Sequence, residues 1–183
     1  MKFQVLEVVF TFFSPSTEDL AETFPSDISA YLPWDLPEVI GKVIDALNPD
    51  LLALSQKEVC PSLGVEAGER GVPVVLMAAT LPDNSKRLTK LGKLFLGPAF
   101  RSLARVAAIS DTDADRFKLF GIPQDRIVVT GDPAVDSAFE RIISLDTESP
   151  HLNLFRDEVM SVFVAGSIWS PDGDILIPAL SRI

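Results

Sequence analysis

Short apolar runs alternate with amphipathic stretches along most of this 183-residue chain. The apolar runs predict strands at residues 3–13, 29–32, 51–54, 72–78, 106–109, 126–130 and 161–165. The amphipathic stretches predict helices at residues 18–23, 37–47, 61–70, 88–105, 111–120, 132–145 and from 174 onward. Continuous apolar strands separated by helices are typical of a parallel sheet that is covered on both faces. The pattern therefore predicts an α/β fold.

The clearest local signals lie between residues 109 and 138. Ser110 ends an apolar run, and Asp111 and Asp113 place negative charge in the first turn of the next helix. Gly121 ends that helix. The loop at Gly131 then follows a strand, at the edge where open α/β sheets bind their ligands.

Two further signals concern helix ends. Asp35 precedes the helix at 37–47 and is expected to cap it. The Gly97-Pro98 pair is expected to break the helix at 88–105, because proline lacks the amide donor that a helix interior requires.

The same pattern divides the chain into three parts. Residues 1–145 are expected to form a Rossmann-like domain with a parallel sheet and flanking helices, and residues 146–159 a linker. Residues 160–183 are expected to be the first strand and helix of a second domain. Because one strand and one helix cannot bury their own apolar faces, we expect this second domain to be truncated here.

Charge excludes one class of partner and suggests another. The net charge of −10 argues against general nucleic-acid binding. Residues 84–110 nevertheless contain no acidic residue, and their basic residues are Lys86, Arg87, Lys90, Lys93, Arg101 and Arg105. Leucines and phenylalanines are interleaved with these cations. The segment is either a solvated helix surface or a patch that meets anionic lipid headgroups or a phosphorylated lipid.

Cysteine and histidine add little chemistry. The single cysteine, Cys60, excludes an internal disulfide and is interpreted as a buried structural residue. His151 is the only histidine, so no pair of these residues has metal-ligand spacing. The apolar run at 3–13 is too short to span a bilayer and is interpreted as a strand.

Several short motifs, in order along the chain, together resemble a known family. They are Thr11-Phe-Phe-Ser-Pro-Ser16, Tyr31-Leu-Pro-Trp-Asp35, Asn48-Pro-Asp-Leu-Leu52, Glu58-Val-Cys-Pro61, Arg70-Gly-Val-Pro-Val74, Ala79-Thr-Leu81 with Ser85, residues 109–138, and Val164-Ala-Gly-Ser-Ile-Trp-Ser-Pro-Asp172. The chain resembles the 3-deoxy-D-manno-octulosonic acid (Kdo) transferases, glycosyltransferases of lipopolysaccharide assembly. No single motif carries the resemblance, but it covers nearly the whole chain.

The resemblance implies a GT-B architecture, in which two Rossmann-like domains face each other across a cleft. The first would hold a lipid A precursor as acceptor, and the second CMP-Kdo as donor. It implies no metal and no other cofactor, and a cytoplasmic protein peripheral to the inner membrane. The oligomeric state stays open.

The resemblance is incomplete at both ends. The family's Gly-Glu motif, whose glutamate is the expected general base, has no counterpart here, and most of the donor domain is absent. We therefore expect a fragment that is incomplete at its N-terminus and inactive alone. Two further departures are Cys60, where the family usually has tryptophan, and Ala134, where it often has a cation.

Candidate site residues follow from their positions after strands. Glu58 is the candidate catalytic residue, and Ser110, Gly131, Asp132, Gly166 and Ser167 are candidates for substrate or donor binding. Each glycine-containing turn could equally be an ordinary capped helix start. The basic patch of Lys86, Arg87, Lys90, Lys93 and Arg101 would face the acceptor or the membrane.

Two other functions remain open from the sequence. A sugar-nucleotide 2-epimerase of the same architecture is compatible with the turn at Val129-Thr-Gly-Asp132 and with Asp136. A non-enzymatic α/β binding module is the other alternative, and it requires a self-sufficient fold that ends near residue 145.

Overall fold

The computed structural model describes residues 7–56, 59–147, 150, 152 and 162–181. The chain forms two compact units, Met1–Ser137 and Ala138–Ile183, which are described separately. The predicted linker at 146–159 lies mostly outside the described residues, so the three-part division stays a prediction.

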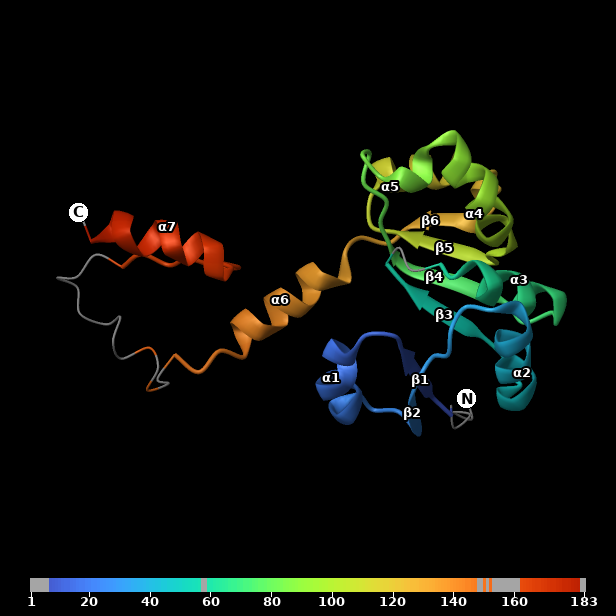
Figure 1. The fold of residues 1–183 in the computed structure, drawn as a ribbon, viewed down its shortest axis with the longest axis horizontal. Coiled ribbons are helices and arrows are strands. Elements are labelled where there is room, and N and C mark those ends of the chain that lie inside the picture. The colour runs from blue at the N-terminus through green and yellow to red at the C-terminus, as the bar shows by residue number, and fades with distance from the viewer. Residues whose placement is uncertain (1–6, 57–58, 148–149, 151, 153–161, 182–183) are drawn as a thin grey trace. The chain divides into compact units, whose positions relative to one another are not determined.

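Two parallel sheets form in the first unit (Figure 1). The larger sheet has the strand order β3 (Leu52–Ser55), β4 (Val74–Ala79), β5 (Arg105–Ala108) and β6 (Ile127–Val129). The smaller sheet pairs β1 (Val9–Phe12) with β2 (Ile28–Tyr31). The predicted α/β fold with a parallel sheet is therefore confirmed, although its strands form two sheets.

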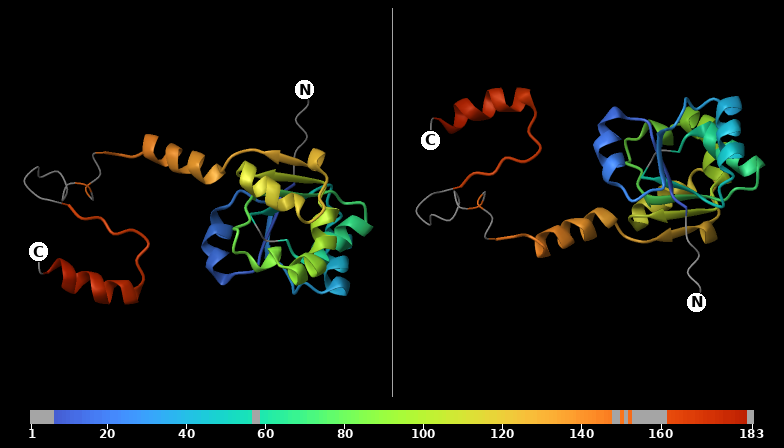
Figure 2. Two further views of the ribbon diagram at one scale, coloured as in Figure 1. Left: turned by 90° about the horizontal axis from the view of Figure 1, so that it is seen from above. Right: turned by 90° about the horizontal axis from the view of Figure 1, so that it is seen from below.

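The helices follow one another in the order that the sequence predicted. They are α1 (Glu18–Thr23), α2 (Pro37–Leu47), α3 (Pro61–Glu69), α4 (Lys90–Ser102), α5 (Asp111–Lys118), α6 (Pro133–Ile143) and α7 (Ser170–Leu180). Short 3₁₀ turns lie at η1 (Pro15–Thr17), η2 (Lys86–Leu88) and η3 (Gln124–Arg126). In all views of Figures 1 and 2, α1 and α2 lie on opposite sides of the β1–β2 pair.

The hydrophobic core lies on one face of the larger sheet. Val74, Leu76 and Val106 are buried, and Phe100 of α4 and Phe117 of α5 fill the space beside them. The alternate positions point to the other face, where Met77 and Val128 are about half exposed (48% and 52%). For the larger sheet, the expectation that helices cover both faces is therefore wrong among the described residues, because α3, α4 and α5 pack on the same face.

Asp35 caps a different helix from the predicted one. Its Oδ2 accepts a hydrogen bond from the amide of Ser62 at 3.1 Å, and its Oδ1 accepts one from Leu63 at 3.0 Å. These two amides belong to the first turn of α3. The N-cap position of α2 is Leu36, which makes no side-chain cap. Asp35 thus ties the start of α2 to α3 through a contact that local sequence spacing does not reveal.

A second polar link joins the far ends of the same two helices. Arg70 donates to Asp45 Oδ1 from Nε and to Glu66 Oε2 from Nη1, both at 2.6 Å. The hydrogen bond from Arg70 lowers the pKa of Asp45, and the two carboxylates raise the pKa of Arg70. On the smaller sheet, Tyr31 donates to Glu18 at 2.7 Å, which raises the tyrosine pKa.

Two further expectations are corrected. Helix α4 continues through Pro98, because the core contacts of Ala99 and Phe100 hold its last turns in place despite the missing amide donor. Residues 162–165 form no strand among the described residues, and α7 begins at Ser170, where the amide of Trp169 donates to the Asp172 carboxylate at 2.9 Å.

Replacing Asp35 tests its cap on α3. Asp35→Ala should lower the free energy of unfolding by about 1–2 kcal/mol, as the loss of an N-cap does, and Asp35→Asn should cost less because its amide oxygen still accepts. Urea denaturation measures both changes. Asp50→Ala, at an exposed acid in the turn after α2, is the control and should change stability by less than about 0.5 kcal/mol. Equal effects at the two positions would contradict the cap.

Candidate ligand-binding edge and the surface of α4

The loops that follow the strands of the larger sheet meet at one edge. Because the strands are parallel, their carboxyl ends all lie there, and this is where open α/β sheets bind ligands. Backbone hydrogen bonds hold the first loop residues in register: Gln56 donates to Met77 at 2.8 Å, Ile109 to Ala79 at 3.0 Å and Thr130 to Ala108 at 2.9 Å. We call this the carboxyl edge.

A buried carboxylate organises the middle of the carboxyl edge. Asp113, in the first turn of α5, is only 6% exposed. Its Oδ1 accepts from the amide of Leu81 at 2.7 Å and from Thr80 Oγ1 at 3.3 Å. Its Oδ2 accepts from the hydroxyl of Ser110. Asp113 therefore fastens the loop after β4 to the start of α5.

Arg116 strengthens the same connection one turn later. Its Nη1 donates to the carbonyl of Leu81 at 2.9 Å, and its Nη2 lies 3.2 Å from Asp83 Oδ1. From the sequence, Asp113 was expected only to place negative charge in the first turn of α5, and Arg116 was assigned no role. The Ser-x-x-Asp spacing of Ser110 and Asp113 is close to a capping-box pattern, which could have indicated the first contact.

The end of β4 has an unusual backbone. Ala78 has a φ of +48°, in the left-handed region that residues with a side chain rarely occupy. The pairing of β4 with β5 shifts register between Leu76 and Ala79. This irregularity redirects Thr80 and Leu81 toward Asp113. Such backbone distortions concentrate at functional sites, although the observation itself names no ligand.

Three predicted binding residues lie along the carboxyl edge. Ser110 is the N-cap of α5 and accepts from the amide of Asp113 at 3.1 Å. Asp132 Oδ1 accepts from the amide of Ala134 at 2.9 Å, at the start of α6. Gly131 has a φ of +82°, and open space surrounds its α-carbon where a side chain would be. Each residue thus has a local structural role, and ligand binding by them stays a prediction.

The remaining candidates lie outside the described part of the first unit. Glu58 lies outside the described residues, as does His151. Gly166 and Ser167 belong to the second unit, in an exposed segment that precedes α7, and Ser167 has a φ of +57°. Their predicted roles are not tested.

The predicted basic patch gathers around the start of α4, with one exception. Lys86 and Arg87 lie on η2, and Lys90 and Lys93 on the first turn of α4, which Thr89 caps by accepting from Gly92 at 3.1 Å. Arg101 lies at the other end of the helix, where it donates to the carbonyl of Phe120 at 3.4 Å.

Large apolar side chains share this part of the helix. Leu91, Leu94 and Phe95 are 67%, 69% and 72% exposed. We define the α4 surface as these three residues with Lys86, Lys90 and Lys93. Exposed apolar side chains flanked by cations are typical of surfaces that meet anionic lipid.

The described residues contain neither a metal-binding cluster nor a membrane-spanning helix. No three histidine, cysteine, aspartate or glutamate side chains there are grouped to hold a metal ion. Within the same residues, no helix is long and apolar enough to span a bilayer.

The fold of the chain is shared with proteins of GT-B architecture. Solved structures with this fold include the Neisseria meningitidis UDP-GlcNAc 2-epimerase bound to UDP-GlcNAc (TM-score 0.55, 14% identity, 76% of this chain and 42% of that one). A putative UDP-N-acetylglucosamine 2-epimerase from Listeria monocytogenes has a TM-score of 0.59, with 18% identity over 82% of this chain and 42% of that one. At these identities the likeness establishes the fold alone.

Sequence comparison then gives the family. The family described as 3-deoxy-D-manno-octulosonic-acid transferase (kdotransferase) matches residues 1–137, and the chain belongs to this family. The transferase of Haemophilus influenzae is 28% identical over 133 residues, which are 72% of this chain and 31% of that protein. The Chlamydia pneumoniae transferase is 24% identical over 156 residues, which are 83% of this chain and 35% of that protein. The chain thus spans about a third of the length of these relatives.

Removing the Asp113 carboxylate tests its role at the carboxyl edge. Asp113→Ala should lower the free energy of unfolding by about 1–3 kcal/mol, because the amide of Leu81 loses its acceptor in a buried place. Asp113→Asn should cost less, since its amide oxygen still accepts. Chemical denaturation gives these values, and amide exchange at Leu81 should accelerate in the alanine variant. Asp115→Ala, which removes an exposed partner of Lys118, is the matched control and should cost less than about 1 kcal/mol.

Proposed function

We propose that this chain takes part in the transfer of Kdo from CMP-Kdo to a lipid A precursor, with residues 1–137 serving as the acceptor-side domain. The match of the Kdo transferase family to those residues carries this proposal. Two curated relatives named as Kdo transferases support it. The donor, the acceptor and the place of the chain in lipopolysaccharide assembly are parts of the proposal.

The α4 surface supports the choice of acceptor. A lipid A precursor is a phosphorylated glycolipid, so it requires cations for its phosphates and apolar surface for its acyl chains. Lys90 and Lys93 supply the first, and exposed Leu94 and Phe95 supply the second, on one helix. The same surface fits the anionic headgroups of a membrane, so we propose a peripheral location on the cytoplasmic side of the inner membrane.

The carboxyl edge is the proposed place of sugar and phosphate recognition. Gly131 permits close approach of a ligand to its backbone, and Asp132 carries a second carboxylate oxygen beside its helix-capping one. Ser110, Gly166 and Ser167 remain proposed donor contacts, and Glu58 the proposed acid–base group. The proposal includes no metal, an expectation that rests on the family resemblance.

The epimerase alternative has one observation in its favour, the fold of the solved neighbours. That likeness is to a shared architecture at 14–18% identity. The family match over residues 1–137 favours the transferase instead.

Ligand binding distinguishes the two functions. We expect saturable binding of the purified chain to a lipid A precursor in detergent micelles, measured by isothermal titration calorimetry against empty micelles. UDP-GlcNAc should give no saturable signal. Binding is the readout because the proposed acceptor surface, the α4 surface, lies within the described residues. Saturation by UDP-GlcNAc without binding of the lipid would favour the epimerase and contradict the proposal.

Charge neutralisation tests the α4 surface. The triple variant Lys86→Gln, Lys90→Gln and Lys93→Gln should bind phosphatidylglycerol vesicles about a hundredfold more weakly than the unaltered chain, since each cation near an anionic surface contributes about 1 kcal/mol. Vesicle co-sedimentation measures the partition.

The control carries the same change of net charge at other places. It combines Lys42→Gln on α2, Lys118→Gln on α5 and Arg141→Gln on α6, and it should bind nearly as well as the unaltered chain. If the two triple variants lose the same affinity, binding depends on net charge alone and the α4 surface has no special role.

A further inference from the structure

Trp34 is the most exposed large apolar side chain among the described residues. It is 83% exposed, although the first unit around it has a well-formed hydrophobic core. Trp169 is nearly as exposed, but it belongs to the second unit, where α7 buries no described side chain. A tryptophan can bury about 150–250 Å² of surface, which makes its exposure to water unfavourable. The exposure of Trp34 therefore favours a contact with a ligand over a role in the fold.

The loop that carries Trp34 is fixed at both ends. At its start, the amide of Leu32 donates to the carbonyl of Phe12 at 2.8 Å. At its end, the Asp35 carboxylate accepts from two amides in the first turn of α3. The hydroxyl of Ser62 donates in return to the Asp35 carbonyl at 2.9 Å. Both neighbouring parts of the loop are thus bonded to other elements of the first unit.

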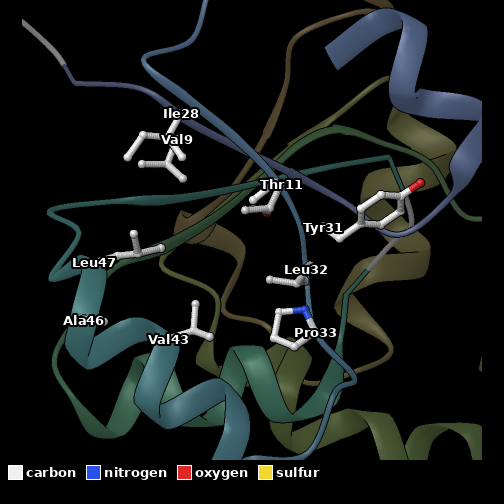
Figure 3. Close-up of a pocket in the computed structure, with 10 residues that line it drawn as sticks. Val9, Thr11, Ile28, Tyr31, Leu32, Pro33, Val43, Ala46 and Leu47 are labelled. Atoms are coloured by element: carbon white, nitrogen blue, oxygen red, sulfur yellow. The ribbon is translucent and has the colours of Figure 1, made fainter. Parts of the chain in front are cut away.

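The backbone beside Trp34 is restricted as well. Leu32 and Pro33 line an apolar groove that residues of β1, β2 and α2 also form (Figure 3). The ring of Pro33 fixes its own backbone φ angle. The amide of Leu36 donates to the Trp34 carbonyl at 2.7 Å, which makes a tight turn. A large ring on such a fixed loop loses little conformational freedom when a ligand covers it.

The same contacts place Trp34 at the carboxyl edge. Helix α3 follows β3, so its first turn lies near the carboxyl end of that strand. Asp35, the residue after Trp34, is bonded to this turn, and the segment from β2 to α2 runs beside the start of α3 (Figure 1). Open α/β sheets bind their ligands at this edge. Trp34 is therefore exposed where a ligand is expected.

A hollow in the surface follows Trp34 in the chain, at the start of α2. It has a volume of about 350 Å³ and is lined by Leu36, Pro37, Glu38 and Val39. Binding sites for small molecules have mostly apolar walls and a few polar groups that orient the ligand. The hollow has this composition, with Glu38 as the charged residue of its lining.

The charges around the loop indicate which ligand it can bind. Glu18 accepts from Tyr31, the last residue of β2, at 2.7 Å, and Glu38 lies in the first turn of α2. Residues 3–41 contain no lysine, arginine or histidine. Like charges repel, so phosphates, nucleotides and anionic headgroups are disfavoured here. A neutral sugar ring instead has hydroxyl groups that donate to carboxylates and an apolar C–H face that packs on an aromatic ring.

We propose that Trp34 stacks on the C–H face of a pyranose ring of the acceptor, away from its phosphates, and that Glu38 accepts hydrogen bonds from the hydroxyl groups of that ring. This inference rests on the proposed function and assigns parts of the acceptor to two places. The sugar binds at the acidic loop after β2, and the phosphates bind at the α4 surface. Trp34 and Glu38 would thereby determine specificity for the acceptor's sugar.

Tryptophan fluorescence tests the contact. The measurement uses the full chain with Trp169→Phe, in which Trp34 is the only tryptophan. The probe is N,N′-diacetylchitobiose, a neutral pyranose disaccharide, and the comparison ligands are CMP and phosphatidylglycerol vesicles. We expect the disaccharide to shift the emission to shorter wavelength and to reduce acrylamide quenching, both saturably, because the indole ring leaves water. CMP and the vesicles should leave the emission of Trp34 unchanged.

Variants supply a second readout, the affinity for the disaccharide measured by calorimetry. Trp34→Ala should weaken binding about three- to tenfold, and Trp34→Phe should weaken it less because a ring remains. Glu38→Gln should weaken it severalfold, since a charged acceptor is replaced by a neutral one. Trp169→Ala, at the other exposed tryptophan, is the matched control and should not change binding. Trp34→Ala should also leave the urea midpoint unchanged, because its side chain is exposed.

Three results would overturn the inference. One is that the disaccharide causes no saturable change in the emission of Trp34. Another is that CMP or the vesicles cause the same change, which would assign Trp34 to a nucleotide or to lipid. The third is that Trp34→Ala binds the disaccharide as tightly as the unaltered chain does.

These outcomes are distinguishable from failure of the proposed function. The triple lysine variant of the α4 surface should bind the neutral disaccharide normally and the phosphorylated lipid A precursor weakly. If the precursor binds the unaltered chain but Trp34 does not respond to the disaccharide, the inference fails and the proposed function stands. If the disaccharide binds at Trp34 but the precursor does not bind, the proposed function fails and the assignment of the ring to the acceptor is overturned.

Discussion

Packing of phenylalanines from α4 and α5 against one face of the larger sheet is the contact on which the rest of the first unit depends. The ring of Phe100 lies 4.3 Å from that of Phe120 and 5.9 Å from that of Phe117, measured between centroids. All three are buried. Fixing these helices also fixes their first turns, one of which carries Asp113 and the other Lys90 and Lys93. The positions of both candidate functional features therefore depend on the same core.

At the carboxyl edge, two side chains that hold the loops, Asp113 and Arg116, were not among those expected to bind ligand. Asp113 and Arg116 use their polar atoms to fix the loop after β4, whereas Gly131 is open to a ligand. A fixed loop reduces the entropy lost when a ligand binds. Asp113 is thus a positioning residue for the proposed site, while Gly131 and Asp132 are suited to direct contact. The chain belongs to the Kdo transferase family and shares its fold with solved UDP-GlcNAc 2-epimerases, so a sugar-transfer role for this edge is a proposal.

Part of the larger sheet of the first unit is uncovered among the described residues. Met77 and Val128 are half exposed on the open face of the larger sheet, and among the described strands β1 and β3 each pair with one neighbour only. Parallel sheets are normally covered on both faces and paired throughout their interior. The strands of the unit are thus as apolar as those of a sheet that is buried on both faces, but part of this sheet is exposed among the described residues.

Sequence alone determined the features that depend on neighbouring residues. The bounds of α1 and α2, the acidic first turn of α5 and the parallel α/β class follow from apolar periodicity and from signals that span three or four residues. Tertiary structure decided the features that depend on distant residues. Asp35 caps α3 instead of α2, α4 continues through Pro98, and the strands divide into two sheets, because each outcome is set by packing between segments that are far apart in the chain. Local pattern cannot specify such contacts, since one sequence spacing is compatible with many spatial partners.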